Sequence, residues 1–366
     1  MSDLQLLEKK QSPSLFDSMQ TYDHEMVVHC NDNASGLRAI VAVHNTTLGP
    51  AMGGVRMWNY ASEAEAITDA LRLSRGMTLK NALAGINVGG GKAVIIGDAR
   101  KHKSEALLRR FGQFINNLNG KYYTAEDVGM TSEDMIHVHH ETPFVTGMPA
   151  YAGGSGDPGT MTAYGVYLGI KASIKQLTGS DSLAGKRILI QGVGSVGADL
   201  AEYLAKEKAE IFIYDLYPSV MKAVVAKTGA KIIEKEAVYQ MELDVFAPCA
   251  LGASLNPDTI PQLNCAIIAG SANNQLLDEV SDAEALRERG ILYAPDFLVN
   301  AGGIINVSLE LEEYNYDRAR QLTEKIYDRT LENFAIASNK NITTHQAALD
   351  MAQSRIDALG HNLLFC

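Results

Sequence analysis

Two lysines are the residues best suited to proton-transfer chemistry in this chain. Lys80 lies in the run Gly-Met-Thr-Leu-Lys-Asn-Ala, and Lys92 follows three consecutive glycines twelve residues later and opens an apolar run. Burial and a second nearby ammonium would both lower the pKa of Lys92, giving a neutral amine that can act as a general base. The alternatives are a turn with a solvent-facing lysine, an anion-binding nest, or a lysine that forms a Schiff base.

Two adjacent acids, Glu126 and Asp127, offer a second proton-transfer group. They lie in the run Tyr-Thr-Ala-Glu-Asp-Val-Gly. Adjacent side chains of an extended segment point to opposite sides, so at most one of the two is expected to face a site. The pattern predicts a short strand before the pair and a helix after it, with a capping box formed by Thr131 and Asp134.

A glycine-rich motif indicates a nucleotide site. Gly192, Gly194 and Gly197 form GxGxxG between an apolar run and a helical pattern. These glycines permit a tight turn, close approach of a pyrophosphate, and close packing of helix on strand. The next apolar run ends in Asp215, 23 residues after Gly192, where a carboxylate accepts the ribose hydroxyls of NAD and repels the 2′-phosphate of NADP. NAD is therefore the predicted cofactor; a glycine turn of another α/β fold and the use of NADP are the alternatives.

The elements that position the lysines are predicted from hydrophobic periodicity. Strands are expected over 38–45 and 92–96 because both runs are rich in β-branched residues. Between them a capping box at Ser62 starts a helix, which Gly76 is expected to end. A second helix is expected from about Ser104 to near Gly120.

The second half of the chain has the pattern of a parallel sheet. Residues 147–160 are rich in glycine, proline and small side chains and mark the expected domain boundary. Beyond them, short apolar runs alternate with helical patterns, as βαβ units require. These runs are 187–191, 211–215, 245–249, 266–269 and 291–294. The last 50 residues show the periodicity of amphipathic helices.

The predicted fold class is therefore α/β with two domains. Residues 1–148 are expected to form an α/β substrate-binding, catalytic and oligomerisation domain, preceded by a loosely held extension up to Pro13. Residues 149–334 are expected to form a Rossmann-type, doubly wound dinucleotide-binding domain. At 366 residues the chain is long enough for both.

Composition narrows the class of protein further. The formal net charge of −11 argues against nucleic acid and anionic membranes as partners, because both select a positive surface. No stretch approaches the roughly 18 apolar residues of a membrane span, and no secretory leader is recognisable. The four cysteines are far apart and show no zinc-ligand spacing, so we expect free thiols in a reducing cytoplasm.

The histidines His137, His139 and His140 are the one cluster that resembles metal ligands. Their spacing on a presumed helix does not bring all three to one face, and no acidic partner is apparent from the sequence. We therefore expect surface side chains and no metal site.

Taken together, the motifs resemble the Glu/Leu/Phe/Val dehydrogenase family, and within it the leucine dehydrogenases most closely. The resemblance runs from about Phe16 to the end of the chain. It is carried by residues 46–58, 76–82, 89–92, 124–129, 247–253, 269–275 and 294–307.

The resemblance implies a reaction and roles for three residues. The reaction is the reversible, NAD-dependent oxidative deamination of a small aliphatic L-amino acid, leucine or another branched-chain one, to a 2-oxo acid and ammonia. Lys80 would hold the substrate carboxylate, Lys92 would be the catalytic base, and Asp127 would carry protons to and from the amine. The family's fold also implies that helices over about 335–366 return to the first domain, and that the chain forms a homo-oligomer, an octamer or smaller.

The resemblance also implies ligand contacts. The expected cofactor-binding residues are Thr162, Gly192, Val193, Gly194, Ser195, Val196, Gly197, Asp215, Asn274 and Asn300. The expected residues around the substrate side chain are Met52, Gly53, Ala125, Ile304 and Val307.

The apolar character of these pocket residues constrains the substrate. Glutamate-specific members carry a lysine just before the Gly-Gly-x-Arg motif, whereas this chain has Met52, which would leave a glutamate side chain unpaired. Phenylalanine-using relatives tend to carry a smaller residue at Ile304. Met52 departs from the leucine found in leucine enzymes, and its flexibility could broaden the pocket. A phenylalanine or tryptophan dehydrogenase of the same family and an inactive NAD-binding regulator are the alternatives.

Overall fold

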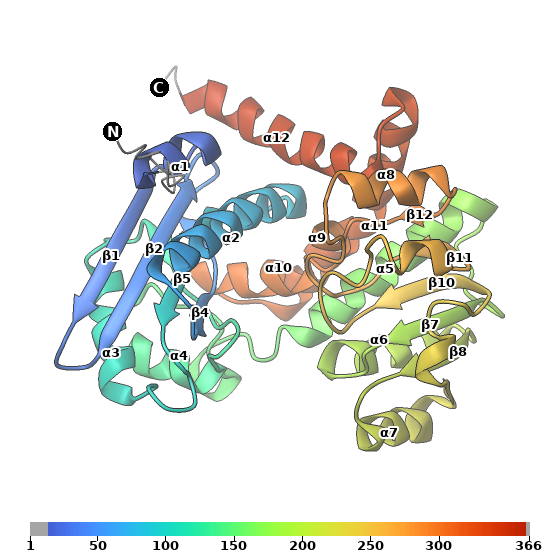
Figure 1. Ribbon diagram of the computed structural model, residues 1–366, viewed down its shortest axis with the longest axis horizontal. Helices are drawn as coiled ribbons and strands as arrows, with labels where there is room; N and C mark the ends of the chain where they lie inside the picture. The colour runs from blue at the N-terminus through green and yellow to red at the C-terminus, as the bar shows by residue number, and fades with distance from the viewer. Residues whose placement is uncertain (1–13, 364–366) are drawn as a thin grey trace, which may run out of the picture. The chain divides into compact units, whose positions relative to one another are not determined.

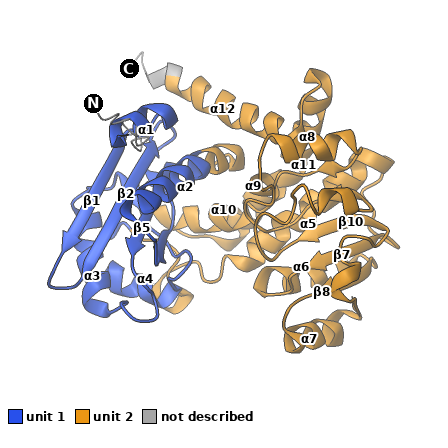
Figure 2. Ribbon diagram, in the orientation of Figure 1, with its two compact units in different colours: residues 1–78, 89–144 blue, residues 79–88, 145–366 orange. Residues whose placement is uncertain are grey.

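The computed structural model describes residues 14–363 (Figure 1), so the predicted N-terminal extension and Cys366 lie outside the described part of the chain. The chain divides into two compact units (Figure 2). Unit 1 consists of residues 1–78 and 89–144, and unit 2 of residues 79–88 and 145–366. The last break between the units, after Phe144, lies close to the boundary predicted at 148.

Unit 1 is built on a mixed six-stranded sheet. In spatial order the strands are β1 (Met26–Asp32), β2 (Leu37–Asn45), β5 (Gly89–Ile96), β3 (Ala51–Met52) and β6 (Tyr122–Tyr123), and β4 (Val55–Trp58) also pairs with β5. The strands β1, β2 and β5 are antiparallel neighbours, whereas β3 and β4 run parallel to β5. The strands predicted over 38–45 and 92–96 are confirmed, and the second begins three residues earlier, at Gly89.

The helix α2 (Glu63–Ala84) is longer than predicted. Gly76 was expected to end it but lies in its interior, so this prediction was wrong. An interior glycine costs only about 1 kcal/mol relative to alanine, and the buried side chains of Leu71 and Leu79 on either side of it outweigh this cost. The helix ends before Gly85, whose φ of +71° is the left-handed conformation that favours glycine at this position.

Three further helices complete unit 1: α1 (Leu15–Tyr22), α3 (Glu105–Asn116) and α4 (Ser132–His139). The start of α3 predicted at about Ser104 is confirmed, and Ser104 caps the helix, but α3 ends four residues before Gly120, because Asn119 and Gly120 adopt positive φ in a turn. The predicted capping box of Thr131 and Asp134 at the start of α4 is confirmed, as is a short strand before the acid pair.

Unit 2 contains a sheet of six strands that all run parallel, which confirms the Rossmann-type prediction. Its spatial order is β12 (Leu292–Tyr293), β11 (Cys265–Ile268), β10 (Leu243–Pro248), β7 (Arg187–Gln191), β8 (Glu210–Tyr214) and β9 (Lys231–Ile232). The strand order reverses between β7 and β10, and ligands bind at such switch points in open α/β sheets.

Hydrophobic cores lie on both faces of this sheet. Ile188 and Ile190 of β7 belong to one core cluster, whereas Leu189 belongs to a second one. Successive side chains of a strand point to opposite faces, so the continuous apolar run of β7 reflects burial on both sides.

Helices and short 3-10 turns complete unit 2. They are η1 (Ala150–Ala152), α5 (Gly159–Thr178), α6 (Ser195–Lys206), α7 (Pro218–Thr228), η2 (Lys235–Ala237), η3 (Ile260–Gln262), α8 (Ser281–Glu288), α9 (Asp296–Val299), α10 (Gly302–Ser308), η4 (Leu309–Leu311), α11 (Tyr316–Lys340) and α12 (Thr344–Leu363). The helical C-terminus is therefore confirmed. Both C-terminal helices are grouped with unit 2, and their association with the first domain stays a prediction.

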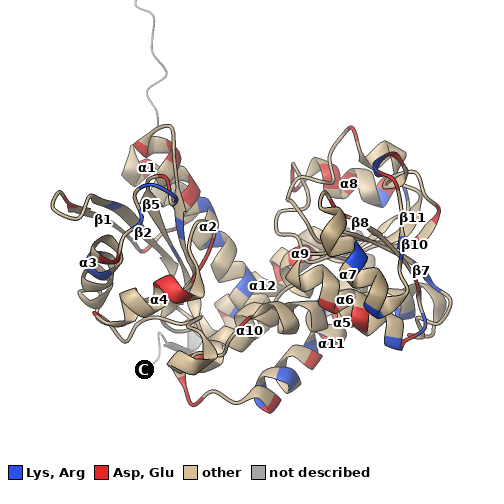
Figure 3. Ribbon diagram, turned by 90° about the horizontal axis from the view of Figure 1, so that it is seen from below, with Lys and Arg blue, Asp and Glu red and all other residues tan. Residues whose placement is uncertain are grey.

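The charged residues do not segregate by sign along the described ribbon. Lys and Arg are interspersed with Asp and Glu in both units (Figure 3). Within residues 14–363, every helix is too short or too polar to cross a membrane.

Candidate active site

Lys92 lies in the middle of β5 and is buried, with 5% of its surface exposed. The three preceding glycines are strand residues, so the alternative of a turn with a solvent-facing lysine is excluded. A Cβ on Gly90 would lie 2.0 Å from Oγ1 of Thr78 in α2, which shows why glycine is needed there. The close approach that Gly90 permits is that of α2 to the sheet.

The ammonium of Lys92 is paired with Asp127. Nζ of Lys92 lies 3.0 Å from Oδ2 of Asp127, and Nε of Arg56 donates a hydrogen bond of 2.9 Å to the same oxygen. One carboxylate oxygen thus contacts two cations. The expectation that at most one of the two adjacent acids faces a site is consistent with this arrangement, in which Asp127 is the inward residue.

Backbone pairing places Asp127 beside Arg56. The amide of Val55 donates to the carbonyl of Ala125 at 2.7 Å, and the amide of Met57 donates to the carbonyl of Val128 at 2.9 Å. The segment that carries Asp127 therefore runs alongside β4. Gly54 allows this approach, because a Cβ there would lie 2.4 Å from the carbonyl oxygen of Glu126.

Tyr60 and Asp69, which sequence reasoning did not single out, extend this network. Nη1 of Arg56 donates to Oδ2 of Asp69 at 3.0 Å, and the hydroxyl of Tyr60 donates to the same oxygen at 2.6 Å. Asp69 lies in α2, among the polar residues of an amphipathic helix, where the sequence gives no signal. Arg56 belonged to a motif quoted for the family resemblance, and its position there was the signal available.

Burial and charge set the protonation states of this network. Burial is the largest influence on Lys92 and lowers its pKa; Asp127 opposes this shift and the guanidinium of Arg56 adds to it, so that the pKa lies below its ordinary value. Burial by itself would raise the pKa of Asp127, but Lys92 and Arg56 outweigh burial and hold that pKa below its ordinary value. The site therefore favours an ionised carboxylate beside an amine that loses its proton more readily than an ordinary lysine.

Lys80 lies in the last part of α2. Two arginines of the C-terminal helices donate hydrogen bonds to carbonyls at the end of this helix. Nη1 of Arg329 donates to the carbonyl of Ala84 at 2.6 Å, and Nη1 of Arg355 donates to the carbonyl of Ile86 at 2.8 Å. Cations near a helix C-terminus satisfy carbonyls that lack intrahelical partners. Lys80 is half-buried. Burial raises the pKa of Asp296, and the charge of Lys80 is one of the influences that lower it.

The predicted side-chain pocket residues lie in both units. In unit 1, Met52 is fully buried in β3, and the carbonyl of the adjacent Gly53 accepts a hydrogen bond from Tyr122 at 2.5 Å. Ala125 follows β6, the strand next to β3. In unit 2, Ile304 and Val307 lie in α10.

The glycine-rich loop follows β7 at the switch point of the parallel sheet. Gly192 has φ of +95°, and a Cβ on Gly197 would lie 2.0 Å from the carbonyl oxygen of Gly192. Beside Gly194 the space for a Cβ is open. The amide of Val193 donates to Oδ2 of Asp215 at 2.9 Å, so this carboxylate fixes the loop and lies at its edge. This arrangement fits a dinucleotide.

The other predicted cofactor residues are placed as follows. Ser195 begins α6 and its hydroxyl donates to Asp157 at 3.0 Å, whereas Val196 packs against the core. Thr162 lies in α5 with its hydroxyl bonded to the carbonyl of Pro158. Asn274 is exposed with φ of +53°.

Asn300 shows the clearest unfilled hydrogen-bonding capacity among these residues. Its Nδ2 donates to the carbonyl of Ser271 at 3.1 Å and to Oδ1 of Asn273 at 2.8 Å. Its Oδ1 is buried without a hydrogen-bond partner. A buried acceptor of this kind is expected to receive a ligand donor.

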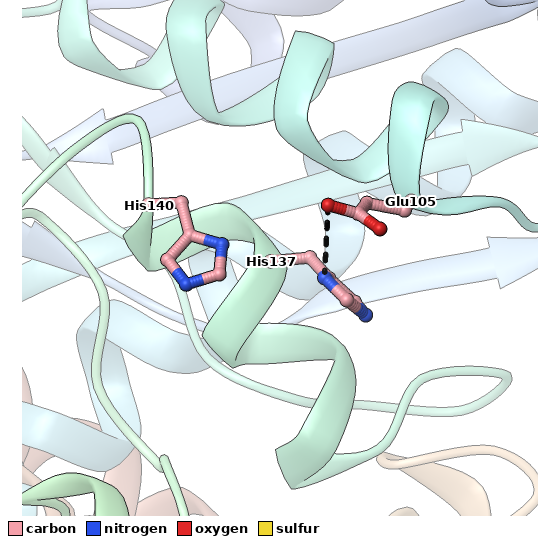
Figure 4. A group of neighbouring side chains, drawn as sticks. All are labelled: Glu105, His137 and His140. Carbon is pink, nitrogen blue, oxygen red and sulfur yellow. Dashed lines mark ion pairs between the residues drawn. The ribbon is translucent and has the colours of Figure 1, made fainter.

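The histidine cluster differs from the prediction in one respect. Glu105 of α3 lies next to His137 and His140 of α4, and ligand atoms of the three residues lie within 4.8 Å of one another (Figure 4). The statement that no acidic partner is present was therefore wrong, because Glu105 is distant in sequence and reaches the histidines through the packing of α3 on α4.

A parallel sheet with a GxGxxG loop, together with a unit in which a buried lysine is paired with a carboxylate, defines a two-domain oxidoreductase of the dinucleotide-dependent dehydrogenase class. Residues 22–144 match the description "Glu/Leu/Phe/Val dehydrogenase, dimerisation domain", and residues 153–215 and 214–359 match "Glutamate/Leucine/Phenylalanine/Valine dehydrogenase".

Individual relatives cover nearly the whole chain. A leucine dehydrogenase of Geobacillus stearothermophilus is 53% identical over 94% of each chain. A phenylalanine dehydrogenase of Lysinibacillus sphaericus is 48% identical over 92% of this chain and 89% of its own. The crystal structure of an L-tryptophan dehydrogenase from Nostoc punctiforme has a TM-score of 0.85 and 41% identity, covering 94% of this chain and 99% of that one.

The chain belongs to the Glu/Leu/Phe/Val dehydrogenase family. It is an amino-acid dehydrogenase similar to leucine dehydrogenases, and the predicted resemblance is confirmed.

Proposed function

We propose that this protein catalyses the reversible, NAD-dependent oxidative deamination of L-leucine and related branched-chain amino acids to 2-oxo acids and ammonia. The observation that carries the proposal is the ion pair between buried Lys92 and partly buried Asp127, with Nζ 3.0 Å from Oδ2. Five leucine dehydrogenases 50–53% identical to this chain support it.

Lys92 and Asp127 divide the proton transfers. Lys92 in its neutral form takes a proton from the water that attacks the substrate iminium carbon. Asp127, which Arg56 helps to keep ionised when Lys92 is neutral, passes protons to and from the substrate nitrogen. Collapse of the resulting carbinolamine breaks the carbon–nitrogen bond and releases ammonia.

Lys80 is proposed to hold the substrate α-carboxylate as a positive point charge. This role requires a fixed ammonium, and the contacts of Arg329 and Arg355 with the end of α2 supply the anchoring.

The chain's residues fit NAD, which when bound accepts the hydride from the substrate Cα. The open space beside Gly194 and the N-terminus of α6 would receive the pyrophosphate, and Asp215 would accept the adenosine ribose hydroxyls. The orphaned Oδ1 of Asn300 would accept a hydrogen bond from the nicotinamide carboxamide. Thr162, Ser195 and Asn274 are proposed as further contacts.

The substrate side chain is proposed to lie among Met52, Gly53, Ala125, Ile304 and Val307, all of them apolar. An aliphatic group gains free energy from leaving water for such surroundings, whereas a carboxylate would be left unpaired. Leucine, isoleucine and valine differ by one methylene or its placement, which separates substrates by only about 1–3 kcal/mol.

A homo-oligomer, an octamer or smaller, is proposed because residues 22–144 match a dimerisation domain. The free thiols of Cys30, Cys249 and Cys265 support a reducing, cytoplasmic location.

Absorbance at 340 nm, which reports the reduced cofactor, tests the proposal with purified protein. The substrates are L-leucine, L-isoleucine, L-valine, L-methionine, L-phenylalanine, L-tryptophan and L-glutamate, each with NAD and then with NADP. Fastest turnover of branched-chain substrates with NAD is expected. Faster turnover of an aromatic substrate would overturn the proposal of an aliphatic pocket but would be compatible with the proposed mechanism. No turnover of any substrate would favour an inactive NAD-binding regulator.

A further inference from the structure

Three side chains with metal-binding atoms meet where α3 begins and α4 ends. Glu105 is the first residue of α3, while His137 and His140 lie three residues apart at the C-terminal end of α4 and so share a face. Their ligand atoms lie within 4.8 Å of one another, and Oε1 of Glu105 is 3.9 Å from Nδ1 of His137 (Figure 4).

The geometry is close to that of a coordinated ion. Zinc binds imidazole nitrogen and carboxylate oxygen at about 2.0–2.2 Å, so two ligand atoms at a tetrahedral angle lie roughly 3.3–3.6 Å apart. The three atoms must therefore move together by roughly 1 Å. Rotations about the side-chain bonds of Glu105 and His140, which are both exposed, can supply this movement.

Two further contacts indicate that the site can take a cation. Nδ1 of His137 is buried without a hydrogen-bond partner and faces the Glu105 carboxylate from beyond hydrogen-bond distance. Such an atom loses its hydration without compensation, and a metal ion would restore a partner. Arg109 competes only weakly for Glu105, at 3.5 Å, because its closer contact of 2.6 Å is with Glu141.

We propose that Glu105, His137 and His140 bind a first-row transition-metal ion such as Zn²⁺. Two imidazoles and one carboxylate suit zinc, cobalt, nickel and copper, whereas magnesium and calcium prefer all-oxygen ligands. The ion joins α3 to α4, and α4 begins five residues after Asp127. The site is structural: it restrains the helix that follows the catalytic segment.

His139 supplies a matched control. It lies on α4 between the two proposed ligands, is exposed, and does not belong to the cluster. We compare His137→Asn, His140→Asn and Glu105→Gln with His139→Asn, all as full-length protein without an affinity tag.

Calorimetric titration with Zn²⁺, the visible absorption of bound Co²⁺ and the thermal unfolding midpoint are the three measurements. The wild-type protein and His139→Asn are expected to bind one ion with the same affinity and to unfold a few degrees higher with Zn²⁺ but not with Mg²⁺. Each of the other three variants is expected to bind at least tenfold more weakly and to lose the Co²⁺ absorption. Equal affinity in the wild-type protein and His137→Asn, or an equal loss in His139→Asn, would overturn the proposal.

Discussion

Nζ of Lys92 lies 3.0 Å from Oδ2 of Asp127, and the lysine is buried within strand β5 of unit 1. Arg56 donates to the same oxygen and so competes with Lys92 for one carboxylate. Burial and the guanidinium of Arg56 lower the pKa of Lys92, whereas the carboxylate of Asp127 raises it. The protonation of Lys92 therefore depends on the balance of these opposing influences.

Replacing Asp127 by asparagine removes the proposed proton carrier and the charge that raises the pKa of Lys92. We expect kcat with leucine to fall by roughly 10²- to 10⁴-fold, the usual contribution of general acid–base catalysis. The acidic limb of the pH profile should move to lower pH. Initial rates across a pH series measure both effects. Glu126→Gln is the matched control, and an equal loss of rate in that variant would contradict the assignment of Asp127.

The end of α2 gives a second prediction. The guanidinium of Arg355 contacts the carbonyls of Ala82 and Ile86 and the Oδ1 of Asn87 at 2.8–3.2 Å. Arg355→Met removes these charge-assisted bonds, so we expect the KM for leucine to rise roughly tenfold, the equivalent of about 1.4 kcal/mol, with a smaller change in kcat.

Steady-state kinetics separates the two constants, and Gln353→Ala on the exposed face of the same helix is the control for that experiment. A fall in kcat with KM unchanged would show that the anchoring of Lys80 is not what Arg355 supplies.

Cofactor choice depends on Asp215 in this account. Asp215→Ser removes the charge that repels a 2′-phosphate, so the ratio of kcat/KM for NAD over NADP should fall roughly tenfold or more. Because Val193 also loses its acceptor, the KM for NAD should rise as well. The control is the exposed Asp258→Asn, and an unchanged ratio in Asp215→Ser would place the ribose contact elsewhere.

A buried histidine predicts how stability depends on pH. Burial, with a smaller effect of His44, lowers the pKa of His24 to about 4, and its Nε2 lies 2.8 Å from the hydroxyl of Ser74. Between about pH 6.5 and pH 4 the unfolded chain binds a proton that the folded chain does not, so stability falls as pH decreases through this window. Above it, His24 is neutral in both states and contributes no slope.

His24→Gln should lose this contribution, which amounts to about 1.4 kcal/mol per pH unit inside the window. Urea unfolding at about pH 7 and about pH 5 measures it, with the exposed His139→Gln as control. Identical pH dependence in the wild-type protein and His24→Gln would show that His24 takes up its proton in the folded state as readily as in the unfolded one.

The sequence was sufficient to predict an element or a site residue where a local pattern of residues determined the structure. The apolar run 187–191 forms β7 with its predicted ends, because burial on both faces leaves a continuous apolar signal. The glycine loop after it was equally clear, since positive φ at Gly192 and close packing at Gly197 each require glycine. Lys92 stood out for a similar reason: three glycines before an apolar run are unusual for a surface charge.

The features that were missed depend on contacts between distant residues. Arg56 and Asp69 are thirteen residues apart and meet across a strand and a helix, and the segment that carries Asp69 does not differ from an ordinary amphipathic helix. Glu105 reaches His137 only because α3 packs on α4. The end of α2 was misplaced because tertiary packing outweighed the small helix penalty of Gly76.

The pH dependence of kcat/KM for leucine, compared between the wild-type protein and two Arg56 variants, tests the central claim most directly. Arg56 lowers the pKa of Lys92, so Arg56→Met should move the acidic limb to higher pH, whereas Arg56→Lys, which keeps a cation beside Asp127, should leave it closer to the wild-type position. If the acidic limb lies at the same pH in Arg56→Met and in the wild-type protein, the result would contradict the claim that Lys92 is the base and that Arg56 and Asp127 set its protonation.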